Sequence, residues 1–248
     1  MSTSHDNTSG AAADSSGPVT LITGGSTGIG AATVKALLAA GHRVAVTGRS
    51  EKKLDALLGE LGAGERLVAL PGDAADWAAV SGAVAATVEA FGRLDNAVSN
   101  AGFSVEGNVE TADPDGMRDM VLTNVLGPSL LIKAALPLLR ETKGRIVLVG
   151  SSGGLKHSPG NLYSATKWAV TALAENTRML ATQDGVGVTL IAPGRVLTPF
   201  WEDRPGGAAA AGPMLTAEQI ADTIVWAVSQ PQGVDVNTVQ LRPTGQAH

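Results

Sequence analysis

The chain has 248 residues, which is long enough for one α/β domain with a large core or for two small domains. Its net charge is -5 and its lysines and arginines form no cluster, which argues against nucleic acid as a partner. The absence of cysteine excludes disulfides, thiolate metal sites and cysteine nucleophiles, and the 4 histidines lack metal-ligand spacing, so we predict no metal site.

The segment 1–17, MSTSHDNTSGAAADSSG, is made of small and polar residues. It lacks both the basic start and the apolar stretch of a secretory signal. We therefore predict a disordered tail over 1–17 and a cytoplasmic protein. No apolar run reaches the roughly 18 residues that a membrane helix requires, which argues against a membrane partner.

From Pro18 onward, short apolar runs alternate with longer amphipathic segments, which is the rhythm of β-α-β units. We expect strands in PVTLITG, HRVAVTG, RLVALPGD, LDNAVSNAG, GRIVLVGSS, GVGVTLIAPG and VDVNTVQLRP. Helices are expected in ATVKALLAAG, WAAVSGAVAATVEAFG, around MVLTNVLGPSLLIKAALPLL, after Tyr163 and in AEQIADTIVWAVSQ. About seven strands with continuous apolar runs predict a doubly wound parallel sheet, in a single α/β Rossmann domain over 18–248.

One low-complexity patch interrupts this pattern, RPGGAAAAGPM at residues 204–214. It lies between a strand end and a helix, where ligands bind in open α/β sheets. The patch is compatible with a mobile substrate lid and equally with a tolerated surface insertion.

A glycine-rich turn, TGGSTGIG, follows the first strand directly and opens a helix. A dinucleotide pyrophosphate needs close backbone amides and the positive end of a helix, and glycine keeps that approach clear. Glycine also serves as ordinary turn punctuation, but the position between strand and helix favours a dinucleotide site. We expect the pyrophosphate to lie against Gly24, Ser26, Thr27, Gly28, Ile29 and Gly30.

The end of the second strand, VAVTGRS, bears on the choice of cofactor. An acidic residue there would bond the adenosine ribose 2′-OH, but Arg49 follows Gly48 and no acid precedes Glu51. A guanidinium suits a 2′-phosphate, so we predict NADP(H) rather than NAD(H). The alternative makes Arg49 a solvated loop residue and Glu51 the start of a helix.

Tyr163 is the only tyrosine in the chain, and Lys167 follows it four positions later, on the same face of a helix. A phenol has a reference pKa of about 10, which is too high for easy proton exchange at neutral pH. The lysine charge, and a helix N-terminus expected after SPGN, would both favour the phenolate. The alternative is a buried structural tyrosine near a surface lysine, so other motifs must decide.

Six motifs occur in a fixed order: TGGSTGIG, NAG at 100–102, TN at 123–124, GSSGG after a strand, YSATK and PGRVLTP. In this order they resemble the short-chain dehydrogenase/reductase family. The resemblance covers residues 18–245, and the motifs are specific jointly rather than singly.

The resemblance implies the catalytic roles. Tyr163 would protonate a carbonyl oxygen as hydride arrives from nicotinamide, or act as the base in the reverse direction. Lys167 would support the phenolate and hold the nicotinamide ribose. Ser151 would bond the substrate oxygen, and Asn124 would anchor a water that connects Lys167 to solvent. Further cofactor contacts implied by the resemblance are Asp73, Asn100, Ala101, Gly102, Pro193, Gly194, Val196 and Thr198.

Three departures from the family pattern stand out. The interval from Ser151 to Tyr163 is one residue shorter than usual, which makes Ser152 a rival for the serine role. SNAG replaces the common NNAG, with Ser99 at the changed position, and Gly25 stands where alanine is frequent.

Some residues keep a structural alternative. Asn124 precedes a Gly-Pro pair and could bond a carbonyl freed at a helix kink. Asp73 could be the N-cap of the next helix, and His157 is best read as an accessory loop residue.

The helix after Tyr163 carries a face of small residues, Ala165, Ala169 and Ala172, with Leu173. Such a face permits close packing of helices, although it could also be internal core. In the resembled family this helix builds subunit interfaces, so we predict a homotetramer or a homodimer.

The substrate is least determined. The terminal VNTVQLRPTGQ is similar to the end of 3-hydroxy-acid dehydrogenases and of an aldehyde reductase of clavulanate formation. Phe200 and Trp201 are expected where the pocket closes. We predict an NADP(H)-dependent carbonyl reductase or alcohol dehydrogenase for an apolar or ring-bearing ketone or aldehyde, as in a natural-product pathway. The alternatives are a 3-hydroxy-acid dehydrogenase, a non-catalytic nucleotide-binding sensor, and an epimerase or dehydratase with a cycling cofactor.

Overall fold

The computed structural model describes residues 17–201 and 212–246. Its centre is a 7-stranded sheet in the order β3-β2-β1-β4-β5-β6-β7, in which every neighbouring pair is parallel. This confirms the predicted doubly wound sheet. The strands are β1 (Val19–Thr23), β2 (Arg43–Gly48), β3 (Leu67–Pro71), β4 (Asn96–Ser99), β5 (Arg145–Val149), β6 (Gly187–Pro193) and β7 (Thr238–Leu241).

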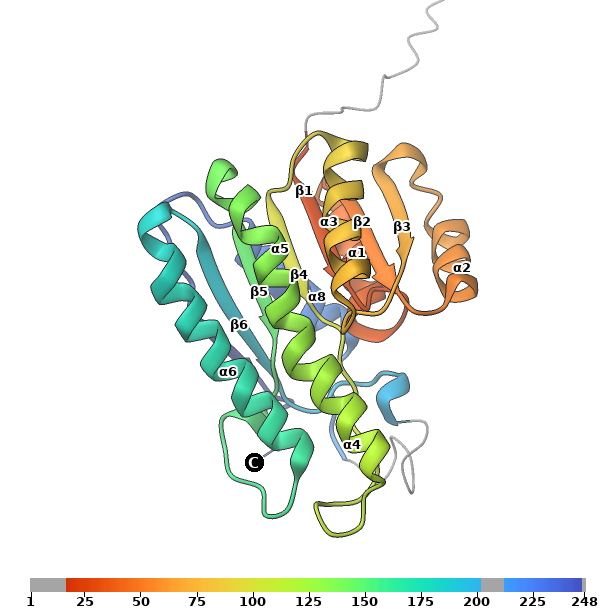
Figure 1. The fold of residues 1–248 in the computed structure, drawn as a ribbon, viewed down its shortest axis with the longest axis vertical. Helices are drawn as coiled ribbons and strands as arrows, with labels where there is room; N and C mark the ends of the chain where they lie inside the picture. Colours follow the sequence, from red (N-terminus) through yellow and green to blue (C-terminus); the bar gives the residue numbers. More distant parts are fainter. Residues whose placement is uncertain (1–16, 202–211, 247–248) are drawn as a thin grey trace, which may run out of the picture.

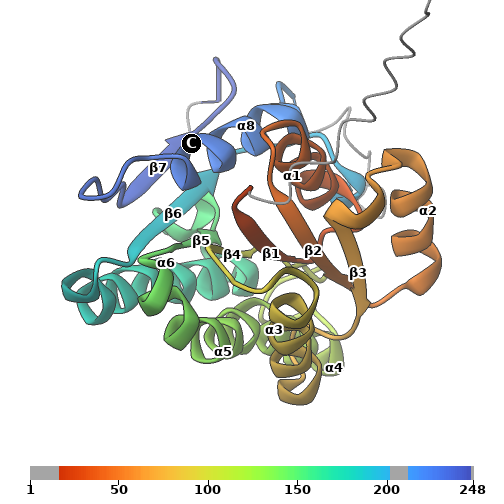
Figure 2. The same ribbon diagram turned by 90° about the horizontal axis from the view of Figure 1, so that it is seen from above.

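Helices cover both faces of the sheet (Figure 2). One face carries α1 (Gly28–Ala39), α2 (Glu51–Leu61) and α8 (Ala217–Val228), and the other carries α3 (Trp77–Phe91), α4 (Pro114–Val121), α5 (Gly127–Thr142) and α6 (Leu162–Ala181). Short helical turns are η1 (Gly64–Arg66), η3 (Ser152–Gly154), η4 (Thr182–Asp184) and η5 (Pro199–Trp201), and η2 (Leu122–Leu126) is a π-helical turn.

The core has two layers, one on each face of the sheet. Leu21 of β1 packs in the layer with Leu131 and Leu139 of α5, while the next residue, Ile22, packs in the layer with Leu37 of α1. Successive side chains of a strand point to opposite faces, so strands that are covered on both sides must be apolar throughout. This is why the strands read as continuous apolar runs in the sequence.

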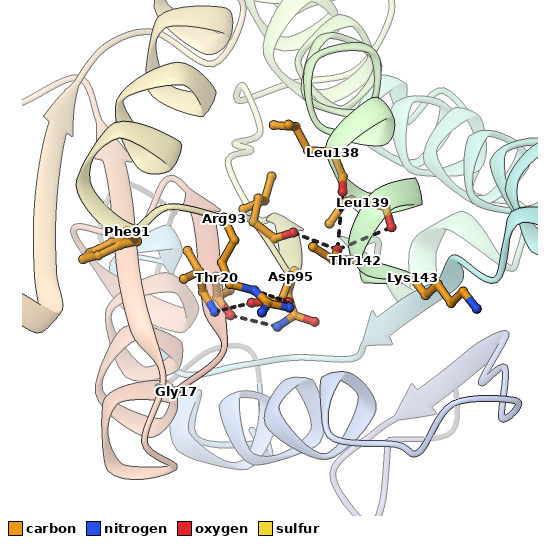
Figure 3. Close-up of polar contacts among 12 residues, drawn as sticks. Gly17, Thr20, Phe91, Arg93, Asp95, Leu138, Leu139, Thr142 and Lys143 are labelled. Carbon is orange, nitrogen blue, oxygen red and sulfur yellow. Dashed lines mark hydrogen bonds and ion pairs between the residues drawn. The ribbon is translucent and has the colours of Figure 1, made fainter. Parts of the chain in front are cut away.

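The end of the sheet where the strands begin is tied together by side chains (Figure 3). The carboxylate of Asp95 accepts from the backbone N–H of Val19 at 2.8 Å and from the guanidinium of Arg93 at 2.6 Å. The hydroxyl of Thr142 donates to the carbonyl of Leu94 at 2.9 Å. These bonds join the start of β1, the start of β4 and the end of α5. Because every neighbouring pair of strands is parallel, their carboxyl ends form one edge at the opposite end of the sheet.

The segments α4, η2 and α5 form one helical stretch, Pro114–Thr142, of 29 residues, which contains an 18-residue window with a mean hydropathy of 1.5. By length and composition alone it could cross a membrane. Leu131, Ala135 and Leu139 of this stretch lie in the core, each 1% exposed or less, so packing within the domain accounts for this part of its apolar residues.

Two predicted segments fall mainly outside the described residues. The tail over 1–17 does so apart from Gly17, and the 204–214 patch does so apart from its last three residues, 212–214.

Candidate active site

A large cleft opens at the carboxyl ends of the strands, where the connecting loops gather at the lower end of Figure 1. Its volume of about 1190 Å³ can hold a dinucleotide and a small substrate together. The cleft lies where β1 and β4 are neighbours and the strand order reverses, which is the usual ligand position in such sheets.

Most residues predicted for the site line this cleft. Gly30 and Asn124 do not, and lie behind its wall. The predicted residues that line it are Gly24, Ser26, Thr27, Gly28, Ile29, Arg49, Asp73, Asn100, Ala101, Gly102, Ser151, Tyr163, Lys167, Pro193, Gly194, Val196 and Thr198.

The glycines of the first turn are required by geometry. Gly24 and Gly28 have φ of 65° and 55°, a region that residues with a Cβ rarely adopt. A Cβ on Gly24 would lie 2.7 Å from the Cα of Ala101, and one on Gly30 would fall onto the carbonyl oxygen of Gly24. A Cβ on Gly25 would collide with Cγ2 of Val46, so the alanine frequent in the family does not fit here without a shift.

The floor of the turn is held by Asn100. Its Nδ2 donates to the carbonyl of Gly24 at 2.8 Å and to that of Thr23 at 3.2 Å. These bonds connect the end of β4 to the turn after β1. At the start of α1, Thr27 makes no side-chain cap bond, so the first amides of the helix are not capped by a side chain. Uncapped amides at a helix start suit an anionic ligand.

The part of the cleft at the ends of β2 and β3 contains Arg49, Lys53 and Asp73. The guanidinium of Arg49 lies 6.0 Å from the ring centroid of Phe103. Lys53 also lines the cleft, and so does Ser50, whose hydroxyl accepts from the Lys53 N–H at 3.3 Å as the N-cap of α2. Asp73 accepts from the N–H of Ala75 at 2.8 Å.

Asp73 was a candidate N-cap for the next helix. The structure gives that role to Asp76, whose carboxylate accepts from the N–H of Ala79 at 2.9 Å. The Asp73 carboxylate instead stands at the edge of the cleft.

Tyr163 lies in the first turn of α6, half-buried, two positions after the N-cap Asn161. The side chain of Asn161 accepts from the N–H of Ser164 at 2.8 Å and fixes where the helix begins. One turn further, Lys167 is 5% exposed and its Nζ lies 5.7 Å from the centroid of the Tyr163 ring. The predicted spacing therefore brings the ammonium and the phenol together at a helix start.

Lys167 is held from below by the sheet. Its Nζ donates to the carbonyl of Val149, the last residue of β5, at 3.0 Å. Burial lowers the pKa of Lys167 to about 8. The amine therefore carries its charge at neutral pH but is close to releasing it.

The two candidate serines follow Val149. Ser151 is partly exposed in the cleft, and its hydroxyl accepts from the N–H of Gly153 at 3.0 Å as the N-cap of η3. Its O–H proton is not used in that bond, so the hydroxyl can still donate to a ligand. Ser152 also borders the cleft, but it is only 6% exposed.

Asn124 is fully buried in the π-helical turn η2. Its Oδ1 accepts from the N–H of Phe103 at 3.0 Å, and its Nδ2 donates to the Phe103 carbonyl at 2.8 Å and to Oγ1 of Thr166 at 3.0 Å. Thr166 in turn donates to the carbonyl of Tyr163 at 2.7 Å. The amide thus joins the loop after β4 to the first turn of α6. These partners lie outside its own helix, unlike those of a simple kink, and π turns are frequent at functional sites.

Aromatic side chains border the cleft beside Tyr163. The ring of Phe200 lies 5.6 Å from that of Tyr163 at an angle of 52°, and Trp201 packs edge-on against Phe200 at 5.7 Å. His157 stacks on Trp168 at 5.5 Å, outside the cleft lining, as expected of a loop residue.

The sequence matches the family model described as short chain dehydrogenase over residues 18–207. The L-fucose dehydrogenase of Mus musculus is 38% identical over 190 residues, which cover 76% of this chain and 68% of that protein. The serine 3-dehydrogenase of Agrobacterium fabrum is 34% identical over 240 residues, 92% of this chain and 94% of that protein. The chain belongs to the short-chain dehydrogenase family.

A solved structure gives the same result for the fold. The alcohol dehydrogenase of the archaeon Thermococcus sibiricus, complexed with 5-hydroxy-NADP, has a TM-score of 0.85 and 29% identity, and the match covers 93% of this chain and 98% of that chain. The protein is therefore a short-chain oxidoreductase. The residues of its cleft fit a nicotinamide dinucleotide, because the glycine turn leaves space that a Cβ would fill and α1 presents uncapped amides.

The site of this short-chain dehydrogenase contains residues that the motifs did not indicate. Phe103 and Thr166 connect Asn124 to the cleft and to Tyr163. Phe103 follows the NAG motif, and Thr166 lies within YSATK, but the motifs gave neither residue a role. Lys53 could have been found from its place in the first turn of the helix after Arg49. Gln246 also lines the cleft, although it lies near the end of the chain.

Proposed function

We propose that this short-chain dehydrogenase is an NADP(H)-dependent carbonyl reductase or alcohol dehydrogenase. The observation that carries the proposal is the buried Lys167 ammonium, 5.7 Å from the ring of Tyr163, in a cleft that Ser151 also lines. A buried cation beside a phenol, with a hydroxyl donor in the same cleft, is suited to moving a proton on and off a carbonyl oxygen. A cytoplasmic location stays a prediction.

The chemistry divides between the cofactor and the chain. When bound, the nicotinamide supplies a hydride to a carbonyl carbon or accepts one from a carbinol carbon. Ser151 donates a hydrogen bond to the substrate oxygen. Tyr163 gives its phenolic proton to that oxygen in reduction and takes it back in oxidation. Lys167 stabilises the phenolate that remains, and its low pKa of about 8 suits it to passing a proton on.

Asn124 lies outside the cleft lining and is linked to Tyr163 through hydrogen bonds. Both N–H groups of its amide are used by Phe103 and Thr166, so one lone pair of Oδ1 is what the side chain retains for a water. We propose that its main task is to hold the first turn of α6 against the loop after β4, and with it the position of Tyr163.

The preference for NADP(H) rests on the end of β2. Arg49 lines the cleft with Lys53 and the capped start of α2, and no acidic residue precedes Glu51 in this stretch. A 2′-phosphate needs positive charge and hydrogen-bond donors, whereas a 2′-OH of NAD(H) needs an acceptor. The Thermococcus sibiricus relative, solved with 5-hydroxy-NADP, supports this choice.

Substitution of Arg49 by alanine is expected to weaken NADPH binding by about 10- to 100-fold and to leave NADH binding unchanged, because only NADPH carries the 2′-phosphate. Fluorescence titration of both cofactors measures this. Lys52→Ala is the matched control, because Lys52 is an exposed cation three positions further on, in the first turn of α2, and does not line the cleft. Equal losses for the two cofactors would refute the assignment.

The aromatic side chains beside Tyr163 indicate which class of substrate the cleft accepts. Phe200 and Trp201 form an apolar border beside Tyr163, which favours a ring-bearing or apolar ketone or aldehyde, such as an intermediate of a natural-product pathway. A second candidate is a 3-hydroxy acid, favoured by the similarity to the Agrobacterium fabrum serine 3-dehydrogenase.

The test is NADPH consumption by the purified protein with a panel of aliphatic, aromatic and bicyclic ketones and aldehydes, and NADP reduction with 3-hydroxy acids. Turnover of the first set supports the proposed function, and turnover of the second set alone supports the second candidate. Substrate conversion without net cofactor change would indicate an epimerase or dehydratase. Cofactor binding without any turnover would favour a nucleotide-binding sensor.

We also propose a homodimer or homotetramer formed through α4–α5 and α6. Ala165 and Ala172 are exposed on α6, and Val121, Leu122 and Leu126 on the neighbouring helix are 37% to 40% exposed. An apolar face of this kind gains free energy when a second copy covers it.

Light scattering at micromolar concentration is expected to give the mass of a dimer or tetramer, and Leu126→Glu is expected to shift it toward the monomer. The substitution places a charge in the proposed interface, where burial is costly. Trp226→Glu is the control, because Trp226 is 49% exposed on α8, which covers the other face of the sheet. A wild-type monomer would contradict the proposal.

A further inference from the structure

Gln246, near the C-terminal end, reaches into the active-site cleft and bonds its wall. Its Oε1 accepts from the backbone N–H of Arg195 at 3.0 Å. Arg195 is half-buried in the loop that follows β6, and both residues line the cleft. A side chain from the end of the chain thus completes a backbone hydrogen bond within the site.

The sequence makes room for this contact at Gly194. A Cβ on Gly194 would lie 2.5 Å from Oε1 of Gln246 and 3.2 Å from its Cδ. The N–H of Gly194 donates to the carbonyl of Leu241 at 2.6 Å, which continues the pairing of β6 with β7. The glycine therefore lets the C-terminal segment lie directly against the loop after β6.

The same loop is held from its other side by the segment that precedes α8. The N–H of Leu215 donates to the carbonyl of Arg195 at 2.8 Å, and the N–H of Leu197 donates to the carbonyl of Leu215 at 2.8 Å. The backbone of Arg195 is thus fixed at its N–H by Gln246 and at its carbonyl by Leu215. Further along the same loop, Thr198 and Phe200 line the cleft.

We propose that Gln246 is a positioning residue of the active site, which holds the loop 194–201 in the arrangement that receives the nicotinamide half of the cofactor. The inference rests on the proposed function, because it requires a nicotinamide dinucleotide in the cleft. Without Gln246, the half-buried N–H of Arg195 loses its acceptor, and an unsatisfied buried donor favours rearrangement of the loop.

A positioning role differs measurably from a general structural one. The loop follows β6, whereas Arg49 and Asp73 follow β2 and β3, which three strands, β1, β4 and β5, separate from β6 in the sheet. A ligand that occupies only the adenosine end should therefore not depend on Gln246, whereas a whole dinucleotide should.

The experiment is equilibrium titration of wild type and Gln246→Met with NADPH and with 2′,5′-ADP, which lacks the nicotinamide half. Methionine keeps the length of the side chain and removes the acceptor. We expect NADPH binding to weaken about tenfold and 2′,5′-ADP binding to stay within about twofold of wild type. Gly194→Ala should give the same pattern, because its Cβ displaces Oε1.

The matched control is Gln232→Met. Gln232 is an exposed glutamine whose Nε2 donates to the carbonyl of Lys143 at 2.7 Å, at the opposite end of the sheet, and both ligands should bind it as they bind wild type. The inference is overturned if Gln246→Met binds NADPH like wild type, or loses both ligands equally. If wild type binds neither ligand, the proposed function fails and the inference fails with it.

Discussion

Tyr163→Phe is expected to lower the turnover number by about 10²- to 10⁴-fold, which is the usual contribution of a positioned general acid or base. The substitution removes one hydroxyl and keeps the ring that packs on Phe200. NADPH binding, measured by fluorescence, is expected to stay within about threefold of wild type. The hydroxyl acts on the substrate oxygen in the transition state and contributes little to the binding of the cofactor.

The chain offers no substitute for this residue, because Tyr163 is its only tyrosine. Phe200→Leu is the control: it alters the same ring contact but leaves the phenol, so its turnover number should fall far less. A Tyr163→Phe protein that retained more than about a tenth of wild-type turnover would remove the phenol from the mechanism.

Lys167→Met is expected to be inactive and, at pH 7, more stable than wild type by about 1–3 kcal/mol. Wild type buries this ammonium at 5% exposure, with the Val149 carbonyl as its hydrogen-bond acceptor. Methionine has a similar length and no charge to desolvate. The lost bond to Val149 offsets part of the gain, because a typical hydrogen bond contributes only about 1 kcal/mol. The Lys167 ammonium is thus needed for activity, although burying its charge lowers the stability of the folded protein.

The stability difference has a defined pH dependence. Below about pH 8 the folded and the unfolded chain both carry the Lys167 charge, so wild type bears the full cost of burying it. Between about pH 8 and 10.5 the folded chain releases the proton first, and wild type gains stability as the pH rises. The advantage of Lys167→Met should therefore be largest below pH 8 and shrink toward pH 10.5.

Urea denaturation at several pH values measures this difference. Lys52→Met is the control, because Lys52 is exposed and its substitution should leave the free energy of unfolding nearly unchanged at every pH. A Lys167→Met protein that is less stable than wild type at pH 7 would show that the buried charge is compensated.

The sequence predicted the features that local rules determine. The apolar runs predicted the parallel sheet, because strands covered on both faces have no polar side. Gly24 and Gly28 were expected at a pyrophosphate turn, and both have positive φ values. The four-residue interval from Tyr163 to Lys167 places both on one helix face. In the structure the Nζ atom of Lys167 lies 5.7 Å from the centroid of the Tyr163 ring.

Contacts between distant segments could not be predicted in the same way. Asn124 bonds Phe103 and Thr166, which lie 21 and 42 positions away, and no spacing rule links them. The π-helical turn that carries Asn124 has no sequence period of its own. The bond from Arg195 to Gln246 spans 51 positions and depends on how β7 ends.

The N-cap of α3 was left open by the sequence. Asp73 and Asp76 both precede α3, and both are good N-cap residues. The helix begins at Trp77, where the apolar pattern predicted it, so Asp76 caps it and Asp73 lines the cleft.

The most direct test of the proposed function uses NADPH that carries deuterium at both C4 positions, together with the carbonyl compound that the panel identifies. We expect the alcohol product to carry one deuterium on its carbinol carbon, and one NADPH to be consumed for each alcohol formed. An alcohol without deuterium, or conversion of the carbonyl compound without NADPH consumption, would contradict direct hydride transfer and the assignment of this protein as a carbonyl reductase.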